Sequence, residues 1–147
     1  AEQWQAVDQI EAELVSAGFT VLEKQVIPKE ARVSIGNRIR GGNWGAGAWK
    51  ASGGLPACAL VLADPAPKTP KAFKRSADIK LDNTRIMHKH VIRDQLNKGR
   101  PRTEQANVLH TSDNTTESLD YIEVLFGEEK KNEIYNRFLS LIDRGAA

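Results

Sequence analysis

The segment NVLHTSDN, residues 107–114, brings together the side chains best suited to chemistry in this chain. His110 carries an imidazole, which is a competent nucleophile near neutral pH and the group used in phosphohistidine chemistry. Asn107 offers an amide that could hydrogen-bond a transferring oxygen, and Ser112 and Asp113 could fix the backbone and orient the imidazole. Two interpretations follow: a phosphate-transferring histidine, or an ordinary histidine that precedes a helix cap. The spacing alone favours the ordinary histidine.

A helix is predicted directly after this segment. Asn114 is a suitable N-cap, and Glu117 at the third helical position completes a pair that resembles a capping box. Gly127 is expected to end the helix. Residues 106–110 are predicted to form a short strand, which would leave His110 beside a helix N-terminus that favours an anion such as phosphate. The buried stripe of this helix is expected to consist of Leu119, Ile122, Leu125 and Phe126.

The other elements follow from the spacing of apolar residues and from the breakers between them. Further helices are predicted over residues 4–15, 84–97 and 134–142, and strands over residues 19–27 and 55–63. The apolar run LPACALVLA, residues 55–63, fits a strand that is buried on both faces. The order helix, strand, loop, strand, helix, short strand, helix, helix predicts an α+β sandwich, in which helices pack on one face of a small, mostly antiparallel sheet.

The glycine-rich segment ARVSIGNRIRGGNWGAGAWKASGG, residues 31–54, is predicted to be a loop, because this much glycine costs backbone entropy inside regular elements. Glycine also lets backbone N–H groups approach an anion closely, so phosphate binding is the alternative. The segment lacks the Gly-x-Gly-x-x-Gly and Walker spacings that would support phosphate binding.

Composition limits the class of protein. At 147 residues the chain is long enough for one domain with a substantial core and too short to expect two. The net charge of +2 gives no electrostatic reason to expect a nucleic-acid or membrane partner. The single cysteine, Cys58, cannot form an internal disulfide, and the apolar runs stay below the roughly 18 residues of a membrane helix. His88 and His90 are two residues apart in a predicted helix and so lie on different faces, and no metal site is predicted. A soluble, cytoplasmic protein is expected.

At these residues the sequence resembles a known family. The segment NVLHTSDNTTESLDYIEVLF, residues 107–126, is similar to the signature of the nucleoside diphosphate kinases, in which Asn-x-x-His-Gly-Ser-Asp precedes a helix. The segment IEAELVSAGFTVLEKQVI, residues 10–27, resembles that family's first helix and following strand, and SGGLPACALVLA, residues 52–63, resembles its next strand. The resemblance implies a single kinase-like domain over residues 1–147, whole or as a piece of a longer protein, with the family's ferredoxin-like α+β fold.

The resemblance also implies roles for the residues of the motif. In that family the histidine takes a phosphate from a nucleoside triphosphate and passes it to a diphosphate, with Mg²⁺ on the phosphates. Carried over by motif, His110 would be the phosphorylated residue, and Asn107 would contact the sugar and the phosphates. Ser112 would support the surroundings of the histidine.

The family's phosphate-contacting arginine has three candidates in this chain. It lies in an Ile-Arg pair upstream of the histidine, and Arg93 in VIRDQ matches that pair if NKGRPR is an insertion. Arg100 and Arg102, within that stretch, are the rivals. The planar fork of arginine suits phosphate oxygens, and it suits a surface carboxylate equally well.

Three departures separate this chain from the active kinases. The glycine after the histidine is Thr111, and the glutamate that orients the imidazole falls at Tyr121. The family's first strand, which ends in Lys-Pro-Asp, has no counterpart in this sequence, so we expect a rearranged sheet or a strand from a partner. The missing lysine and glutamate supply charge stabilisation and positioning, which are the main sources of phosphoryl-transfer catalysis.

Two functions follow from the resemblance. The first is a divergent kinase-like domain that binds nucleotide or a protein partner, with weak or no phosphotransfer, of the sort found in ciliary and flagellar assemblies. The second is an active nucleoside diphosphate kinase, which would transfer the γ-phosphate of a nucleoside triphosphate to a diphosphate through phosphohistidine at His110. The sequence leaves open whether the chain forms oligomers.

Overall fold

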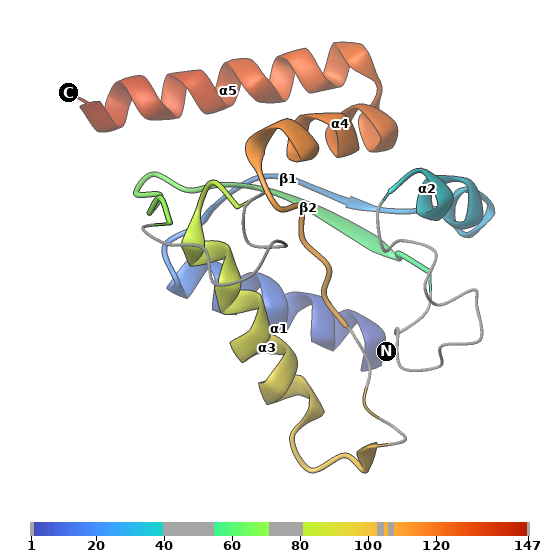
Figure 1. The fold of residues 1–147 in the computed structure, drawn as a ribbon. Helices are drawn as coiled ribbons and strands as arrows, with labels where there is room; N and C mark the ends of the chain where they lie inside the picture. The colour runs from blue at the N-terminus through green and yellow to red at the C-terminus, as the bar shows by residue number, and fades with distance from the viewer. Residues whose placement is uncertain (1, 40–54, 71–80, 103–104, 106–107, 147) are drawn as a thin grey trace.

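Two antiparallel strands lie at the centre of the molecule, with helices around them (Figure 1). The computed structural model describes residues 2–39, 55–70, 81–102, 105 and 108–146. None of the helices in these ranges combines the length and apolar character that a membrane span requires. The elements, with η for a 3₁₀ helix, are α1 (Glu2–Ser16), β1 (Thr20–Val26), η1 (Lys29–Ala31), α2 (Arg32–Arg38), β2 (Cys58–Ala63), η5 (Thr84–Met87), α3 (His88–Asn97), α4 (Thr115–Phe126) and α5 (Glu128–Ala146).

The sheet confirms the two longer strands predicted from the sequence. β1 pairs with β2 antiparallel, from Thr20 opposite Ala63 to Val26 opposite Cys58, and the register shifts between Val21 and Glu23. The extra residue of such a bulge bends the strand and increases its twist. The described part of the chain is therefore α+β, with a two-stranded antiparallel sheet and five α-helices.

Helices cover both faces of this sheet, so the prediction of helices on one face was wrong. α1 and α3 lie on one side of the strands, and α4 and α5 lie on the other (Figure 1). On the first side Leu60 and Leu62 of β2 pack against a buried cluster made of Ile10, Leu14, Phe19 and Ile92. On the second side the intervening Val61 of β2 joins a cluster with Ile122 and Ile134. Successive side chains of a strand point to opposite faces, so the wholly apolar run of β2 requires cover on both.

Two other local predictions also need correction. Residues 31–54 were expected to form a loop, but Arg32–Arg38 form the helix α2. This stretch holds a single glycine, Gly36, and the glycine-rich part begins only at residue 41. Residues 40–54 lie outside the described ranges. Residues 108–110, predicted as part of a short strand, have no regular structure, and Ala106 and Asn107 are not described.

Arg85 joins the ends of α1 and β2. Its guanidinium donates a hydrogen bond to the carbonyl of Ala17 and forms an ion pair of 3.0 Å with Asp64, and it lies over the ring of Phe19 at 5.5 Å. Gly18, which follows α1, has a φ of +106°, and a Cβ atom there would overlap Nη2 of Arg85. The glycine therefore serves both the left-handed turn and the close approach of the arginine.

An ionic network fixes α5 to β1 at the bulge. Oε2 of Glu23 accepts from Nη2 of Arg137 at 3.0 Å and lies 3.2 Å from Nζ of Lys130. Nη1 of Arg137 donates to the carbonyl of Leu22 at 2.6 Å. The hydrogen bonds from Lys130 and then Arg137 hold the pKa of Glu23 below its usual value. The ionised form of Glu23 thus stabilises the contact between strand and helix.

We predict that Glu23→Gln lowers the melting temperature at pH 7 and flattens its decline in acid. The folded-state pKa of Glu23 is depressed, so its contribution is present above the ordinary carboxylate pKa and is lost as the pH falls through the lowered value. The difference in melting temperature between wild type and variant should therefore shrink from pH 6 to pH 3 (about the range of carboxylate titration). Glu30→Gln, at an exposed position, is the matched control. A constant difference across this range would contradict the prediction.

The core predicts a sharp contrast between two neighbouring residues of α3. Ile92 is 1% exposed, whereas Val91 is 46% exposed. Ile92→Ala should lower the free energy of unfolding by about 2–5 kcal/mol, because it removes buried methyl groups and leaves a cavity. Val91→Ala should change it by no more than about 0.5 kcal/mol. Urea denaturation of both variants checks this, and equal losses would show that α3 does not pack as described.

Candidate functional site

Arg93 connects α3 to the segment that carries His110. The side chain of Arg93 is half-buried, and its Nε donates a hydrogen bond of 2.7 Å to the carbonyl of Leu109. This bond gives a partner to a backbone carbonyl that lies outside any strand. Burial lowers the pKa of Arg93, but a guanidinium keeps its charge in proteins. A fixed positive charge therefore lies beside the residue that precedes His110.

His110 and Thr111 are half-buried residues, and one polar atom in each is hidden from solvent. Nε2 of His110 and Oγ1 of Thr111 make no hydrogen bond within the described residues. His110 has another interaction elsewhere in the chain. Both atoms are unusual in this respect, because buried polar atoms nearly always have a hydrogen-bond partner.

Ser112 is directed toward the first turn of α4. Its hydroxyl and that of Ser118 are hydrogen-bonded to each other, and the Ser118 hydroxyl also donates to the carbonyl of Asn114 at 3.0 Å. These bonds fix the backbone between His110 and the helix. The role of Ser112 in supporting the histidine stays a prediction.

The cap of α4 is confirmed, with a shift of one residue in the return bond. Oδ1 of Asn114 accepts from the backbone N–H of Glu117 at 2.8 Å. Oε1 of Glu117 accepts from the backbone N–H of Asp113 at 3.0 Å, one residue before the cap. Gly127 ends the helix with a φ of +85°, as predicted. The local signals of the sequence were thus sufficient to place both ends of α4.

A carboxylate from a distant part of the chain already lies at the N-terminus of α4. Oδ2 of Asp82 accepts hydrogen bonds from the backbone N–H and from the hydroxyl of Thr115, each at 2.8 Å. The sequence indicated that this helix end would favour an anion such as phosphate. The anion that the structure places there is Asp82, whose charge opposes a phosphate at the same N–H group.

Replacing Asp82 should therefore measure the value of this carboxylate to α4. Asp82→Ala should lower the free energy of unfolding by about 1 kcal/mol, because it removes two hydrogen bonds and a favourable charge at the helix N-terminus. Asp120→Asn, on the exposed side of the same helix, should have a much smaller effect. Thermal unfolding of both variants at low and high salt checks this. Equal stability of Asp82→Ala and wild type would show that the contact contributes nothing in solution.

The structure separates the three candidate arginines. Arg93 is bonded to the segment that contains His110. Arg100 and Arg102 are exposed residues in the turn after α3, where the backbone N–H of Arg100 donates to the carbonyl of Asn97 at 3.0 Å. No hydrogen bond or ion pair given for the described residues joins either of them to residues 108–114. Asn107 lies outside the described ranges, so its predicted role stays untested.

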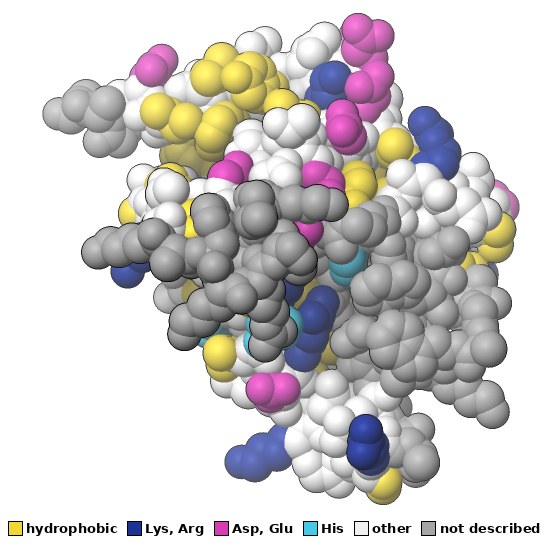
Figure 2. Space-filling view, in the orientation of Figure 1, with side chains coloured by type: hydrophobic (Ala, Val, Ile, Leu, Met, Phe, Trp, Pro, Cys, Tyr) yellow, Lys and Arg dark blue, Asp and Glu magenta, His cyan; other side chains and the backbone are white. Residues whose placement is uncertain are grey.

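Lys89 is a residue that the sequence analysis missed. It precedes Arg93 by about one helical turn. At 9% exposure, it is the charged residue that is classed as buried among the described residues. Its position in the sequence, three residues before the buried Ile92, is the signal that could have revealed it, because residues three and four apart share a helix face. Figure 2 shows basic and histidine side chains close together on the face that Figure 1 presents, bordered by residues that are not described.

His88 and His90 lie in the first turn of α3. His90 is an exposed residue. Desolvation of its imidazole is the main cause that lowers the pKa of His90, and the positive charges of Arg93 and Lys89 lower it further. No cluster of three or more metal-ligating side chains occurs among the described residues. A magnesium ion carried by a nucleotide would depend on phosphate oxygens as well as on protein groups.

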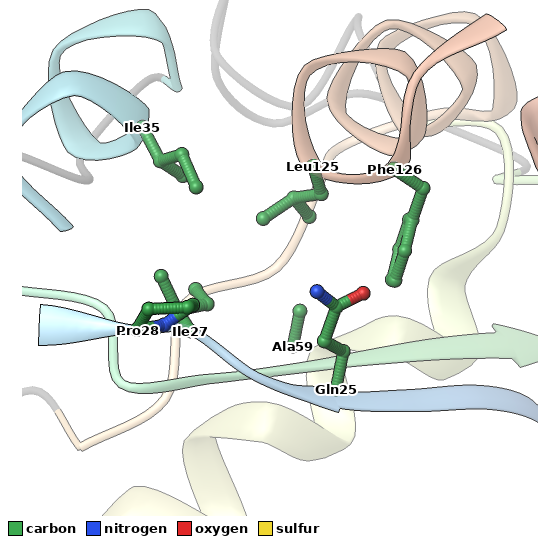
Figure 3. A pocket seen from close by; sticks show the side chains of 7 residues that line it. All are labelled: Gln25, Ile27, Pro28, Ile35, Ala59, Leu125 and Phe126. Atoms are coloured by element: carbon green, nitrogen blue, oxygen red, sulfur yellow. The ribbon is translucent and has the colours of Figure 1, made fainter. Parts of the chain in front are cut away.

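Two hollows lie away from His110. One is a cavity of about 10 Å³ between the strands, α2 and α4, which has room for about one water molecule (Figure 3). Its lining residues are Gln25, Ile27, Pro28, Ile35, Ala59, Leu125 and Phe126. The other is an open groove of about 490 Å³ along α5, bordered by Leu22 of β1. Neither includes Arg93 or His110, so the first is a packing gap and the second a separate surface feature.

Comparison of the chain with protein-family models, with curated proteins and with solved structures finds no match. What is shown of the protein is therefore its architecture and the bond from Arg93 to the segment that carries His110. That architecture is α+β, with two antiparallel strands and helices on both faces.

Proposed function

We propose that the chain is a divergent nucleoside diphosphate kinase-like domain, which binds a nucleotide through its phosphates at Arg93 and His110 and has weak or no phosphotransfer activity. The observation that supports this most is the hydrogen bond of 2.7 Å between Nε of Arg93 and the carbonyl of Leu109. It joins Arg93, one of the three candidate arginines, to the residue that precedes His110. The ferredoxin-like sandwich of that family is part of the proposal.

The donors of Arg93 suit a phosphate ligand. Its Nε is bonded to the backbone, and the terminal N–H groups of the guanidinium are further donors that a phosphate could use. Arginine binds phosphate oxygens with short, charge-assisted hydrogen bonds. A half-buried guanidinium is also less screened by solvent than one on an exposed turn, which favours Arg93 over Arg100 and Arg102.

Weak phosphotransfer follows from the groups around the histidine. Tyr121 on α4 stands where the resembled family has a glutamate, and a phenol cannot supply that negative charge at neutral pH. The helix end next to the histidine carries the carboxylate of Asp82, which opposes the charge that a transferring phosphate brings. Phosphoryl transfer depends on charge stabilisation and positioning, so binding can persist where catalysis is lost.

Binding is tested by calorimetry with ADP and Mg²⁺. Arg93→Met should weaken ADP binding about tenfold or more, since hydrogen bonds to charged groups contribute about 1.5–3 kcal/mol. Arg100→Met, in the exposed turn, is the matched control and should bind as the wild type does. Failure of the wild type to bind any nucleotide would overturn the proposal and favour a protein-interaction module.

Catalysis is tested separately by incubation with γ-labelled ATP and Mg²⁺, followed by an acid-lability test. Little or no label is expected on the wild type. Strong acid-labile label that His110→Ala abolishes would overturn the claim of weak transfer and establish an active nucleoside diphosphate kinase working through phosphohistidine.

A further inference from the structure

The C-terminal half of α5 carries apolar side chains that the rest of the described chain does not cover. Ile134 is 2% exposed and packs in a cluster with Val61. Tyr135, Leu139 and Ile142 are 40%, 41% and 46% exposed. α5 extends beyond the end of α4 in Figure 1, and Figure 2 shows hydrophobic side chains gathered along this part of the helix. The helix therefore has more apolar surface than its own fold buries.

The three exposed residues form one stripe along the helix, which we call the α5 stripe. They are separated by four and then three residues, the spacing that keeps side chains on one face of a helix. Phe138 is half-buried beside the stripe, and the centre of its ring lies 6.1 Å from that of Tyr135. The same spacing occurs in the seam between two packed helices. An exposed stripe of this kind marks a contact surface.

The α5 stripe is complementary to a second copy of itself. Its midpoint lies between Phe138 and Leu139, and Tyr135 and Ile142 are equally far from it along the chain. In two antiparallel α5 helices, Tyr135 of each copy therefore lies level with Ile142 of the other, and the central residues of the two copies meet. A two-fold axis requires this symmetry, because the same patch must fit itself.

The charges of α5 favour the antiparallel arrangement. Its first turn carries Glu128 and Glu129, and its last turn carries Arg144. No ion pair among the described residues involves these three. About the same midpoint, Arg144 of one copy lies level with Glu133 of the other, about one turn from the acidic end of that helix. A parallel arrangement would bring like charges and like helix ends together, whereas the antiparallel one places opposite ends side by side.

We propose that the α5 stripe is the contact between two copies of this chain, whose α5 helices pack antiparallel about a two-fold axis. The second copy covers the apolar side chains that the fold leaves exposed. Only a few side chains from each copy take part, so the association is weak and increases with protein concentration. The dimer goes beyond the proposed nucleotide binding and does not depend on it.

Sedimentation equilibrium over a range of protein concentrations tests the dimer. The average mass of the wild type should rise with concentration from that of one chain toward that of two. Ile142→Lys should remain a monomer throughout, because it places a charge inside the contact. Val91→Lys is the matched control and should associate as the wild type does, since Val91 is also 46% exposed on a helix. Circular dichroism checks that both variants fold.

Disulfide cross-linking tests the antiparallel direction, in a Cys58→Ser background that removes the native thiol. Leu139→Cys, next to the midpoint, should form a cross-link between two copies. Tyr135→Cys alone should not, because its two copies lie about 10 Å apart along the helix axis and a disulfide needs Cα atoms within about 7 Å. A mixture of Tyr135→Cys and Ile142→Cys should cross-link.

Three results would overturn the dimer. The first is a wild type that stays monomeric at millimolar concentration, which would leave the α5 stripe to a different protein that offers an apolar groove. The second is an Ile142→Lys variant that associates as the wild type does. The third is efficient cross-linking of Tyr135→Cys with itself, which would indicate parallel helices. None of these results depends on ADP binding, which tests the proposed function separately.

Discussion

The burial of β2 on both faces is the constraint on which the rest of the structure depends. A two-stranded sheet is marginal by itself, and apolar side chains on both sides of β2 can be removed from water only by two layers of helices. Once α1 and α3 occupy one layer and α4 and α5 the other, the chain must cross between the layers after α3. Residues 108–114 are that crossing (Figure 1). The position of His110 is thus a consequence of how the strand is covered.

Charges then decide what the crossing segment can bind. On the α3 side, Arg93 brings positive charge to it and also bonds its backbone. On the α4 side, Asp82 neutralises the helix end that would otherwise attract an anion. A phosphate near His110 would therefore be drawn toward α3 and repelled from the N-terminus of α4. This asymmetry suits the holding of a phosphate better than its transfer, which needs stabilising charge on both sides of the reacting group.

The proposed function separates two properties that are usually found together in kinases. Binding requires donors and positive charge, which a helix face supplies without precise alignment of a nucleophile. Transfer requires the imidazole to be oriented and the developing charge to be balanced at the same moment. Tyr121 and Asp82 both oppose that second requirement, because one lacks a carboxylate and the other adds one in an unfavourable place. Under this proposal, the differences from the kinase family affect phosphate transfer more than phosphate binding.

The sequence by itself determined the features that depend on neighbouring residues. The two-sided burial of β2, the cap at Asn114 and the end of α4 at Gly127 were all predictable, because apolar period, side-chain capping and glycine turns act over a few residues. Only the tertiary structure decided that helices cover both faces and that Arg93 bonds Leu109. It alone brought Asp82 to a helix that begins 33 residues later. These contacts depend on which elements meet across the sheet, and the spacing of residues along a chain does not fix that meeting.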